Sequence, residues 1–197
     1  MRNENRREAL LACALTLFSE KGFDSVGVAQ IVEEAQVTKP TLYYFFKSKE
    51  GLFQAILDTY YQPLNDELRH AAEYDARPKE YYDDVYPTLK AVAQTYYTFA
   101  QAHPEFFRLF LSLIFSPPTA AVTEWTAPYE KEQYDILSEM FEKILTAHQN
   151  LKGNERRFAR YFAALIHSEI GFWMRNEVTL DEQNADFLVR RFMHGIF

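Results

Sequence analysis

Residues 37–52 read VTKPTLYYFFKSKEGL, and this stretch decides what the rest of the chain is expected to be. Its beginning predicts a turn over Gln36–Thr38 and then a short helix over about Lys39–Phe45. Pro40 falls in the first turn of that helix, where proline is tolerated. Ser48 is a residue type that caps helices, so a longer helix should follow directly.

A second short helix is expected just ahead of the turn, over about Val28–Ala35. Gly27 is its expected N-cap, and Gln30 stands three residues on, where a side chain can reach back. The first helix, about Glu4–Glu20, should end at Gly22, a residue type common after a helix C-terminus. Two short helices joined by a tight turn and braced by a third describe a helix-turn-helix. In such a motif the second helix presents its first residues to base edges of DNA.

Helical periodicity continues through the rest of the chain, and no alternating pattern predicts a strand. We expect an all-α fold of about nine helices. A three-helix helix-turn-helix domain over residues 1–50 precedes a larger helical ligand-binding and dimerisation domain over residues 51–197. The fourth helix, about 49–75 with Pro63 inside, should link the two. The fifth helix is expected over about Tyr81–Ala102, and the sixth should begin at Pro104. The seventh should reach about Gln149, and the eighth should run from Gly153 to about Asn176. A Thr179–Glu182 capping box should begin the last helix.

Composition narrows the class of protein. Hydrophobic residues make up 48% of the 197 residues and charged residues 25%, as in ordinary globular proteins. The single cysteine, Cys13, cannot form an internal disulfide, which suits a reducing cytoplasm. No small-residue cleavage site follows the apolar run that ends at Phe18, and the longest later apolar stretch, Phe106–Phe115, is far short of the roughly 18 residues that a membrane span needs. We expect a cytoplasmic protein without a membrane segment.

The charge distribution allows a nucleic-acid partner despite a net charge of −7. Residues 1–50 hold seven basic and seven acidic side chains, so the whole net charge lies after residue 50. A neutral N-terminal region can still present a basic face to DNA.

An enzyme is not expected. Glu67 and His70 form a Glu-x-x-His pair, but di-iron bundles need two such pairs, and no other histidine has a glutamate three residues earlier. The sequence shows no phosphate loop, nucleophile elbow or Cys/His metal cluster. We therefore predict no catalytic residue, no metal and no cofactor.

A family resemblance follows from Gly22-Phe23, Ile31, Ala35 and the whole of residues 37–52. Between about Arg6 and Leu57 the chain resembles the DNA-binding region of the TetR (tetracycline-repressor) family, whereas the rest matches only in its layout of helices. The resemblance implies a DNA-binding transcriptional regulator. It places Lys39, Thr41 and Tyr44 toward the major groove. The full expected DNA-binding set is Gly27, Gln30, Thr38, Lys39, Pro40, Thr41, Tyr43, Tyr44 and Lys49, in which Tyr43 and Lys49 match phosphate-binding positions. Ile31, Val37, Leu42 and Phe46 would form the small core behind them.

Three residues depart from the usual family pattern. Gly27 stands where the family usually has Ser or Thr, so it supplies no side-chain cap. Gln36 replaces a common glycine in the turn, and Pro40 replaces another. The competing interpretation of residues 41–46 is a core helix with aromatic packing, but the whole set of residues favours DNA binding.

Residues 80–175 are dense in aromatic side chains, and most of these should form a core. Buried tyrosines and tryptophans also carry polar atoms, which suits a largely apolar small-molecule pocket. By resemblance the pocket lies among the fifth to eighth helices, and a small apolar or aromatic ligand releases a repressor from its operator. The pocket candidates are Tyr97, His103, Phe107, Phe110, Trp125, Tyr129, His167 and Trp173. The alternative is a helical DNA-binding or interaction module without a small-molecule effector.

The eighth helix is apolar on more than one side, which indicates burial against a partner as well as against its own domain. By resemblance it pairs with the last helix and with their copies in a homodimer, and a two-fold dimer reads an inverted-repeat operator. The expected interface residues are Ala159, Ala163, Ile166, Ile170, Leu188, Phe192 and Ile196.

Overall fold

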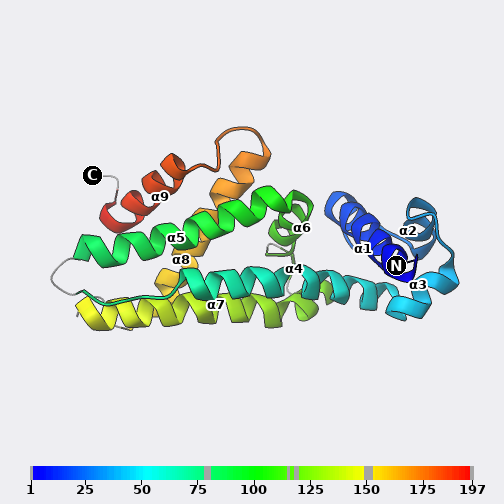
Figure 1. Ribbon diagram of the computed structural model, residues 1–197, viewed down its shortest axis with the longest axis horizontal. Helices are drawn as coiled ribbons and strands as arrows, with labels where there is room; N and C mark the ends of the chain where they lie inside the picture. The colour runs from blue at the N-terminus through cyan, green and yellow to red at the C-terminus, as the bar shows by residue number, and fades with distance from the viewer. Residues whose placement is uncertain (1, 78–80, 115, 118–119, 149–152, 196–197) are drawn as a thin grey trace. The chain divides into compact units, whose positions relative to one another are not determined.

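Every regular element in the described part of the chain is an α-helix (Figure 1). The computed structural model describes residues 2–77, 81–114, 116–117, 120–148 and 153–195. The helices in these ranges are α1 (Arg2–Lys21), α2 (Val28–Glu34), α3 (Lys39–Phe46), α4 (Lys49–Ala71), α5 (Tyr81–Ala102), α6 (Pro104–Ile114), α7 (Ala121–His148), α8 (Glu155–Met174) and α9 (Glu182–His194). The all-α prediction is therefore confirmed. No described helix has both the length and the apolar run that crossing a membrane requires.

The expected helix ends agree with the structure to within a few residues, with one informative difference at α9. Its N-cap is Asp181, whose carboxylate oxygen accepts the N–H of Asn184 at 2.9 Å. Thr179, which the capping-box pattern indicated, instead donates its hydroxyl to Asp181. A carboxylate next to the positive end of a helix is the better cap, because it also complements the helix dipole.

The chain packs as two compact units. The head unit comprises Met1–Gln62 and Pro104–Ala127, and the bundle unit comprises Pro63–His103 and Pro128–Phe197. This differs from a boundary at residue 50, because the head unit also takes in α6 and the start of α7. Two helices, α4 and α7, contribute residues to both units.

In the head unit, α1 packs against α2, α3 and α6. Leu10 and Phe18 of α1, Ile31 of α2, Leu42 of α3 and Phe53 of α4 are all buried there. Burying side chains of this size stabilises a fold by about 1.5–3 kcal/mol each. The small core expected behind the DNA-binding residues is thus largely present, although Val37 is only half-buried.

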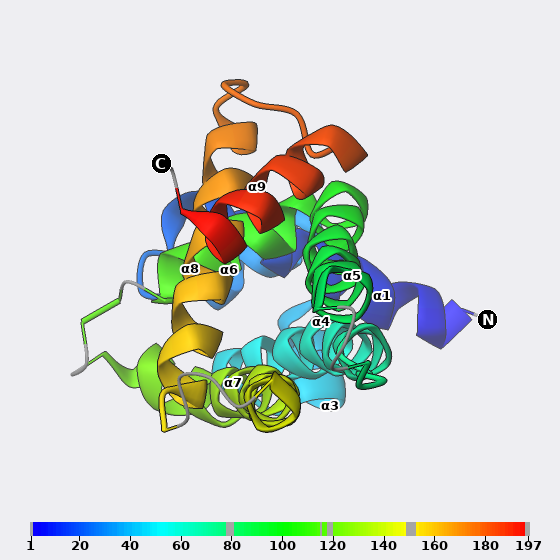
Figure 2. The ribbon, with the colours of Figure 1, turned by 90° about the vertical axis from the view of Figure 1, so that its left-hand side faces the viewer.

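In the bundle unit, α5 packs against α8 and α9, and α8 also packs against α9 (Figure 2). Most of the interior is apolar, with Val92, Leu137, Phe162 and Ile166 fully buried. The same unit also buries the polar side chains of Asn65, Asp84, Gln133 and His167, and a buried polar group needs a hydrogen-bond partner or a functional reason.

Asp84 has such partners. Its carboxylate accepts hydrogen bonds from the Tyr74 hydroxyl at 2.8 Å and from the Arg77 backbone N–H at 2.6 Å. Nε2 of His148, at the end of α7, lies 3.1 Å from the same carboxylate. The cluster ties the segment after α4 to α5 and α7 within the bundle unit.

Candidate nucleic-acid interface and effector site

The turn between α2 and α3 has the tight geometry that a helix-turn-helix needs. The Val37 N–H donates to the Val32 carbonyl at 2.9 Å, and the Thr41 N–H donates to the Thr38 carbonyl at 2.9 Å. Gln36 adopts φ +52°, in the left-handed region. A residue with a Cβ pays about 1–2 kcal/mol for that conformation, which explains why glycine is favoured at this position.

The first residues of α3 and those just before it form an exposed, polar surface. Thr38, Lys39 and Pro40 are exposed, and the side chains of Tyr43 and Tyr44 remain 46% and 68% exposed. The hydroxyls of Thr38 and Thr41 are 2.9 Å apart and share a hydrogen bond, which orients Thr41. The first turn of α3 contains no acidic residue. Hydroxyl, ammonium and phenol groups at the start of a short exposed helix suit a DNA groove and its phosphates.

The α3–α4 junction depends on glycine at position 51. The Gly51 N–H donates to the Ser48 side chain at 3.0 Å, which caps α4 as the sequence indicated. A Cβ at Gly51 would lie 2.0 Å from the backbone oxygen of Phe46. Only glycine allows the end of α3 and the start of α4 to approach this closely. Gly51 belongs to the matched motif, but its role appears only in the folded geometry.

Lys49 braces the head unit from inside. Its ammonium donates to the carbonyls of Phe23 and Val26, each at 3.0 Å, and lies 4.0 Å from the centre of the Phe23 ring. Two of the three ammonium donors are therefore used within the protein, which leaves one for a phosphate. The expectation of a plain phosphate contact missed this structural role.

Gly27 is the N-cap of α2, as expected, and it makes no side-chain cap. Its carbonyl accepts the N–H groups of Gln30 and Ile31 at 3.1 and 3.2 Å. Gln30 is half-buried. All nine residues of the expected DNA-binding set thus lie in the head unit, on or beside α2, α3 and the start of α4.

The expected pocket residues do not gather in one unit. Phe107 and Phe110 are fully buried in the head unit, where Phe110 packs against Tyr61 at a ring distance of 5.7 Å. Trp125 also lies there, with its ring 5.2 Å from Phe23 and 5.8 Å from Phe53. All three residues pack among other aromatic side chains, as residues of an aromatic core do.

The other pocket candidates lie in the bundle unit. Tyr97 and His167 are buried, whereas His103, Tyr129 and Trp173 are half-buried. Burial lowers the pKa of His167 to about 4, so this side chain is neutral at pH 7. Its ring lies 5.6 Å from that of Tyr96, a buried tyrosine that the sequence interpretation did not select.

Two buried amides, Asn65 on α4 and Gln133 on α7, also escaped the sequence interpretation. The side-chain amide of Asn65 donates to the Glu132 carboxylate at 3.0 Å, and Arg69 donates to the same carboxylate. A signal was present, because each amide stands among apolar residues at helical spacing, with Leu64 and Leu68 around Asn65.

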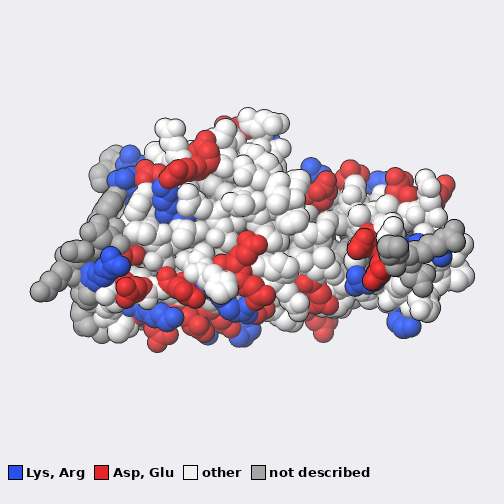
Figure 3. Space-filling model, viewed as in Figure 1, with Lys and Arg blue, Asp and Glu red and all other residues white. Residues whose placement is uncertain are grey.

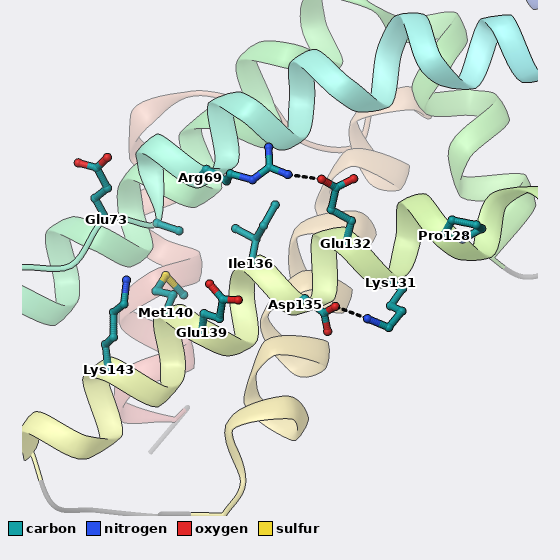
Figure 4. A pocket seen from close by; sticks show the side chains of 11 residues that line it. Arg69, Glu73, Pro128, Lys131, Glu132, Asp135, Ile136, Glu139, Met140 and Lys143 are labelled. Atoms are coloured by element: carbon teal, nitrogen blue, oxygen red, sulfur yellow. Dashed lines mark hydrogen bonds and ion pairs between the residues drawn. The ribbon is translucent and has the colours of Figure 1, made fainter.

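The bundle unit also has a surface groove of about 400 Å³ between the end of α4 and α7 (Figure 4). Ion pairs cross or flank it, with Arg69 bound to Glu132 and Lys131 bound to Asp135. Acidic and basic side chains lie side by side along α7 in Figure 3. Such a groove does not suit an apolar effector. Among the described residues, no three acidic, histidine or cysteine side chains are grouped as a metal site would require.

The expected interface on α8 is corrected by the structure. Ala159, Ala163, Ile166 and Ile170 are buried within the subunit, and so is Leu188 of α9. Phe192 packs against Phe162 of the same chain at 4.9 Å, and Ile196 lies outside the described residues. The exposed apolar side chains are instead Tyr161, Leu165 and Phe172 on α8 and Phe187 on α9. Both stripes of α8 are apolar, and only packing shows which one faces its own core.

Comparisons with known proteins agree with this geometry. The sequence model described as bacterial regulatory proteins, tetR family, matches residues 10–56, all within the head unit. Over these residues the chain matches the TetR family. The helix-turn-helix is therefore that of a DNA-binding transcriptional regulator.

Relatives extend the similarity beyond the head unit. The transcriptional activator FasR of Mycolicibacterium smegmatis is 25% identical over 92% of this chain and 78% of its own length. The repressor ComR of Escherichia coli is 39% identical over 71 residues, which are 36% of this chain and 31% of ComR. Bacillus subtilis FadR, solved in complex with stearoyl-CoA, has a TM-score of 0.77 at 16% identity and covers 96% of this chain and 99% of its own. FadR of Bacillus halodurans has a TM-score of 0.76 at 14% identity, with 97% and 96% covered.

Proposed function

We propose that this TetR-family regulator is a repressor that binds an inverted-repeat operator as a homodimer. The observation that carries the proposal is the exposed, polar start of α3, in which Lys39, Thr41 and Tyr44 stand on a firmly packed helix-turn-helix. Two such helices related by two-fold symmetry would enter major grooves about one helical turn, roughly 34–36 Å, apart. The protein would act in the cytoplasm, without catalysis, metal or cofactor.

Selection of bound fragments from random or genomic DNA tests the operator proposal. The selected sequences should contain an inverted repeat, and Thr41→Ala should change the preferred bases. If the purified protein selects no DNA at low salt without added ligand, the proposal fails. A reporter placed behind the selected site then measures the direction of regulation. Increased reporter expression on adding the protein would favour activation, the activity named for FasR.

Dimerisation is proposed through the outer faces of α8 and α9. Tyr161, Leu165 and Phe172 form an exposed apolar stripe on α8, and water-exposed apolar side chains of this size favour association. Leu165 and Ile166 make a matched pair, because they are adjacent but 43% and 0% exposed.

Leu165→Glu should therefore give a folded monomer, because its charge would enter the interface. Ile166→Glu should unfold or aggregate, because its charge would enter the core. Light scattering and circular dichroism separate these outcomes. A wild-type monomer at micromolar concentration would contradict the dimer.

We further propose that a small apolar or aromatic effector binds in the bundle unit and weakens DNA binding. The support is the concentration of buried polar atoms on α4, α5, α7 and α8 inside an apolar interior, the usual make-up of a small-molecule site. Since α4 and α7 continue into the head unit, a ligand that prefers one arrangement of these helices would shift the population that binds DNA. An interaction module without an effector remains the alternative.

Stearoyl-CoA, the molecule bound in the B. subtilis FadR structure, is the first probe for this step. Titrating it into the protein with and without operator DNA should show that each weakens the other by the same factor, because allosteric coupling is reciprocal. Equal affinity in the two titrations would contradict control by this ligand.

A further inference from the structure

Three helices of the bundle unit bury polar atoms that have no hydrogen-bond partner among the described residues. They are Oδ1 of Asn65 on α4, the Tyr97 hydroxyl on α5 and Nε2 of Gln133 on α7. Asn65 is 1% exposed and Gln133 4% exposed. Buried polar groups are nearly always satisfied, and leaving one unpaired costs stability, so atoms of this kind need a reason.

Each of the two amides neighbours Glu132, one through a hydrogen bond and the other along the chain. Nδ2 of Asn65 donates to the Glu132 carboxylate at 3.0 Å, and Gln133 follows Glu132 in α7. This bond uses a donor of Asn65, so the oxygen that remains is an acceptor, whereas the unpaired atom of Gln133 is a donor. A molecule that reached both side chains from the interior of the unit, and not from the surface groove, would thus meet one acceptor and one donor.

The electrostatics around the two amides disfavour a charged molecule. The buried polar residues of the described chain include no lysine and no arginine. Elsewhere in the same unit, His167 on α8 adds no positive charge at pH 7, because burial lowers its pKa to about 4. The Glu132 carboxylate adjoins Asn65 and would repel an anion, and its own charge is already paired with Arg69. A buried ion would lose its hydration without gaining a free counter-charge.

We infer that the effector is a neutral molecule with an apolar body and a group that both donates and accepts hydrogen bonds. Asn65 and Gln133 form hydrogen bonds with this group. The inference rests on the effector proposed above and specifies its chemistry. A primary amide carries both the donor that Oδ1 of Asn65 needs and the acceptor that Nε2 of Gln133 needs. The unpaired atoms cost the free protein stability, and the ligand recovers that cost when it binds.

A matched series of ten-carbon probes tests the ligand class by calorimetry at pH 7.5. The probes are decanamide, decanoate and decylamine, which share an apolar chain and carry a neutral, an anionic and a cationic head. We expect decanamide to bind at least about tenfold more tightly than either ion. Equal or tighter binding of decanoate or decylamine would overturn the inference, and so would a lack of decanamide binding.

Gln133→Leu provides a second test that needs no ligand. The variant removes an unpaired buried donor at similar volume, so its melting temperature should rise by about 2–4 °C. Decanamide affinity should fall at least about tenfold. Gln62→Leu makes the same change at an exposed position of α4 and should alter neither property. A lower melting temperature for Gln133→Leu would mean that the fold needs the amide, which overturns the inference.

The two proposals fail in different ways. If wild-type protein binds operator and stearoyl-CoA releases it, but decanamide does not bind, the regulator stands and the neutral-ligand inference is wrong. If decanamide binds and Gln133→Leu abolishes this, but no operator is selected, the ligand inference stands and the DNA-binding proposal fails.

Discussion

The helix-turn-helix and the bundle unit differ in whether they bury polar side chains. Between α2 and the end of α3, the buried residues are Ile31, Val32, Leu42 and Phe46, all apolar. The bundle unit instead buries amides, a histidine and a carboxylate. A motif that must hold one shape for DNA gains from an apolar core and tight backbone turns. The unpaired atoms of Asn65 and Gln133 lower the stability of the bundle unit, and the proposed ligand would use them.

The largest expected effect lies in the head unit, at the contact between α3 and α4. Gly51→Ala places a Cβ 2.0 Å from the Phe46 backbone oxygen, and backbone cannot yield as a side chain can. We expect a loss of about 3–5 kcal/mol in the free energy of unfolding, measured by urea denaturation. Gly27→Ala is the control, because nothing lies within 4 Å of its Cβ position, and it should cost a few tenths of a kcal/mol. Similar stabilities for the two variants would show that the close approach is unimportant.

The bundle unit should lose almost as much at Asp84. Asp84→Ala leaves the Tyr74 hydroxyl, the Arg77 N–H and Nε2 of His148 without their shared partner, so it should destabilise the protein by about 3 kcal/mol at pH 7. Asp135→Ala breaks an exposed pair with Lys131 and should cost under about 0.5 kcal/mol. Urea midpoints of the two variants measure the contrast, and equal midpoints would contradict it.

The pH dependence of that effect has a definite sign. Burial works to raise the pKa of Asp84, but hydrogen bonds from the Arg77 N–H, the Tyr74 hydroxyl and His148 outweigh it, so the pKa lies below the ordinary value of 3.8. A carboxyl group with a lowered folded pKa contributes stability that is complete above its unfolded pKa and is lost as the pH falls through the folded value. The contribution of the Asp84 carboxylate to the difference between wild type and Asp84→Ala should therefore be complete at pH 5 and shrink as the pH falls below about 3.8.

A smaller effect separates the two lysines of the DNA-binding set. Lys49→Met removes two charge-assisted hydrogen bonds to the backbone carbonyls of Phe23 and Val26, and it should lower the free energy of unfolding by about 2 kcal/mol. Lys39 is exposed, so Lys39→Ala should leave stability unchanged and reduce the slope of log K against log salt by about one. Denaturation and salt-dependent DNA binding measure both variants. A stable Lys49→Met protein with a reduced salt slope would restore the simple phosphate role.

The smallest predicted effect is a gain. Gln36→Gly relieves the φ of +52° in the turn and should raise the free energy of unfolding by about 1 kcal/mol. Gln30→Gly makes the same substitution inside α2 and should lower it by a similar amount, because glycine is unfavourable in a helix. Loss of stability in both variants would contradict the strained-turn interpretation.

The sequence predicted the helices well, because the signals that start and end them act over a few residues. Gly22, with φ +77°, ends α1 as expected, and Ser48 caps the start of α4. The site was predicted unevenly. The DNA-binding stretch is contiguous, so its residues lie together once the turn forms. The prediction of Phe107 and Trp125 as pocket residues rests on residue type alone. Residue type does not determine which unit a helix belongs to.

By itself, then, the sequence determined an all-α chain, the helix-turn-helix and the match of residues 10–56 to the TetR family, through periodicity, caps and a contiguous motif. Only the tertiary structure decided that Lys49 turns inward, that Ile166 and not Leu165 faces the core, and that α6 packs on α1. The tertiary structure also brought together Asn65 and Glu132, which are 67 residues apart in the sequence. The physical reason is the sequence distance over which each effect acts. Local backbone preferences act within a turn or two of helix, whereas contacts between residues far apart in the sequence decide which face of a helix is buried.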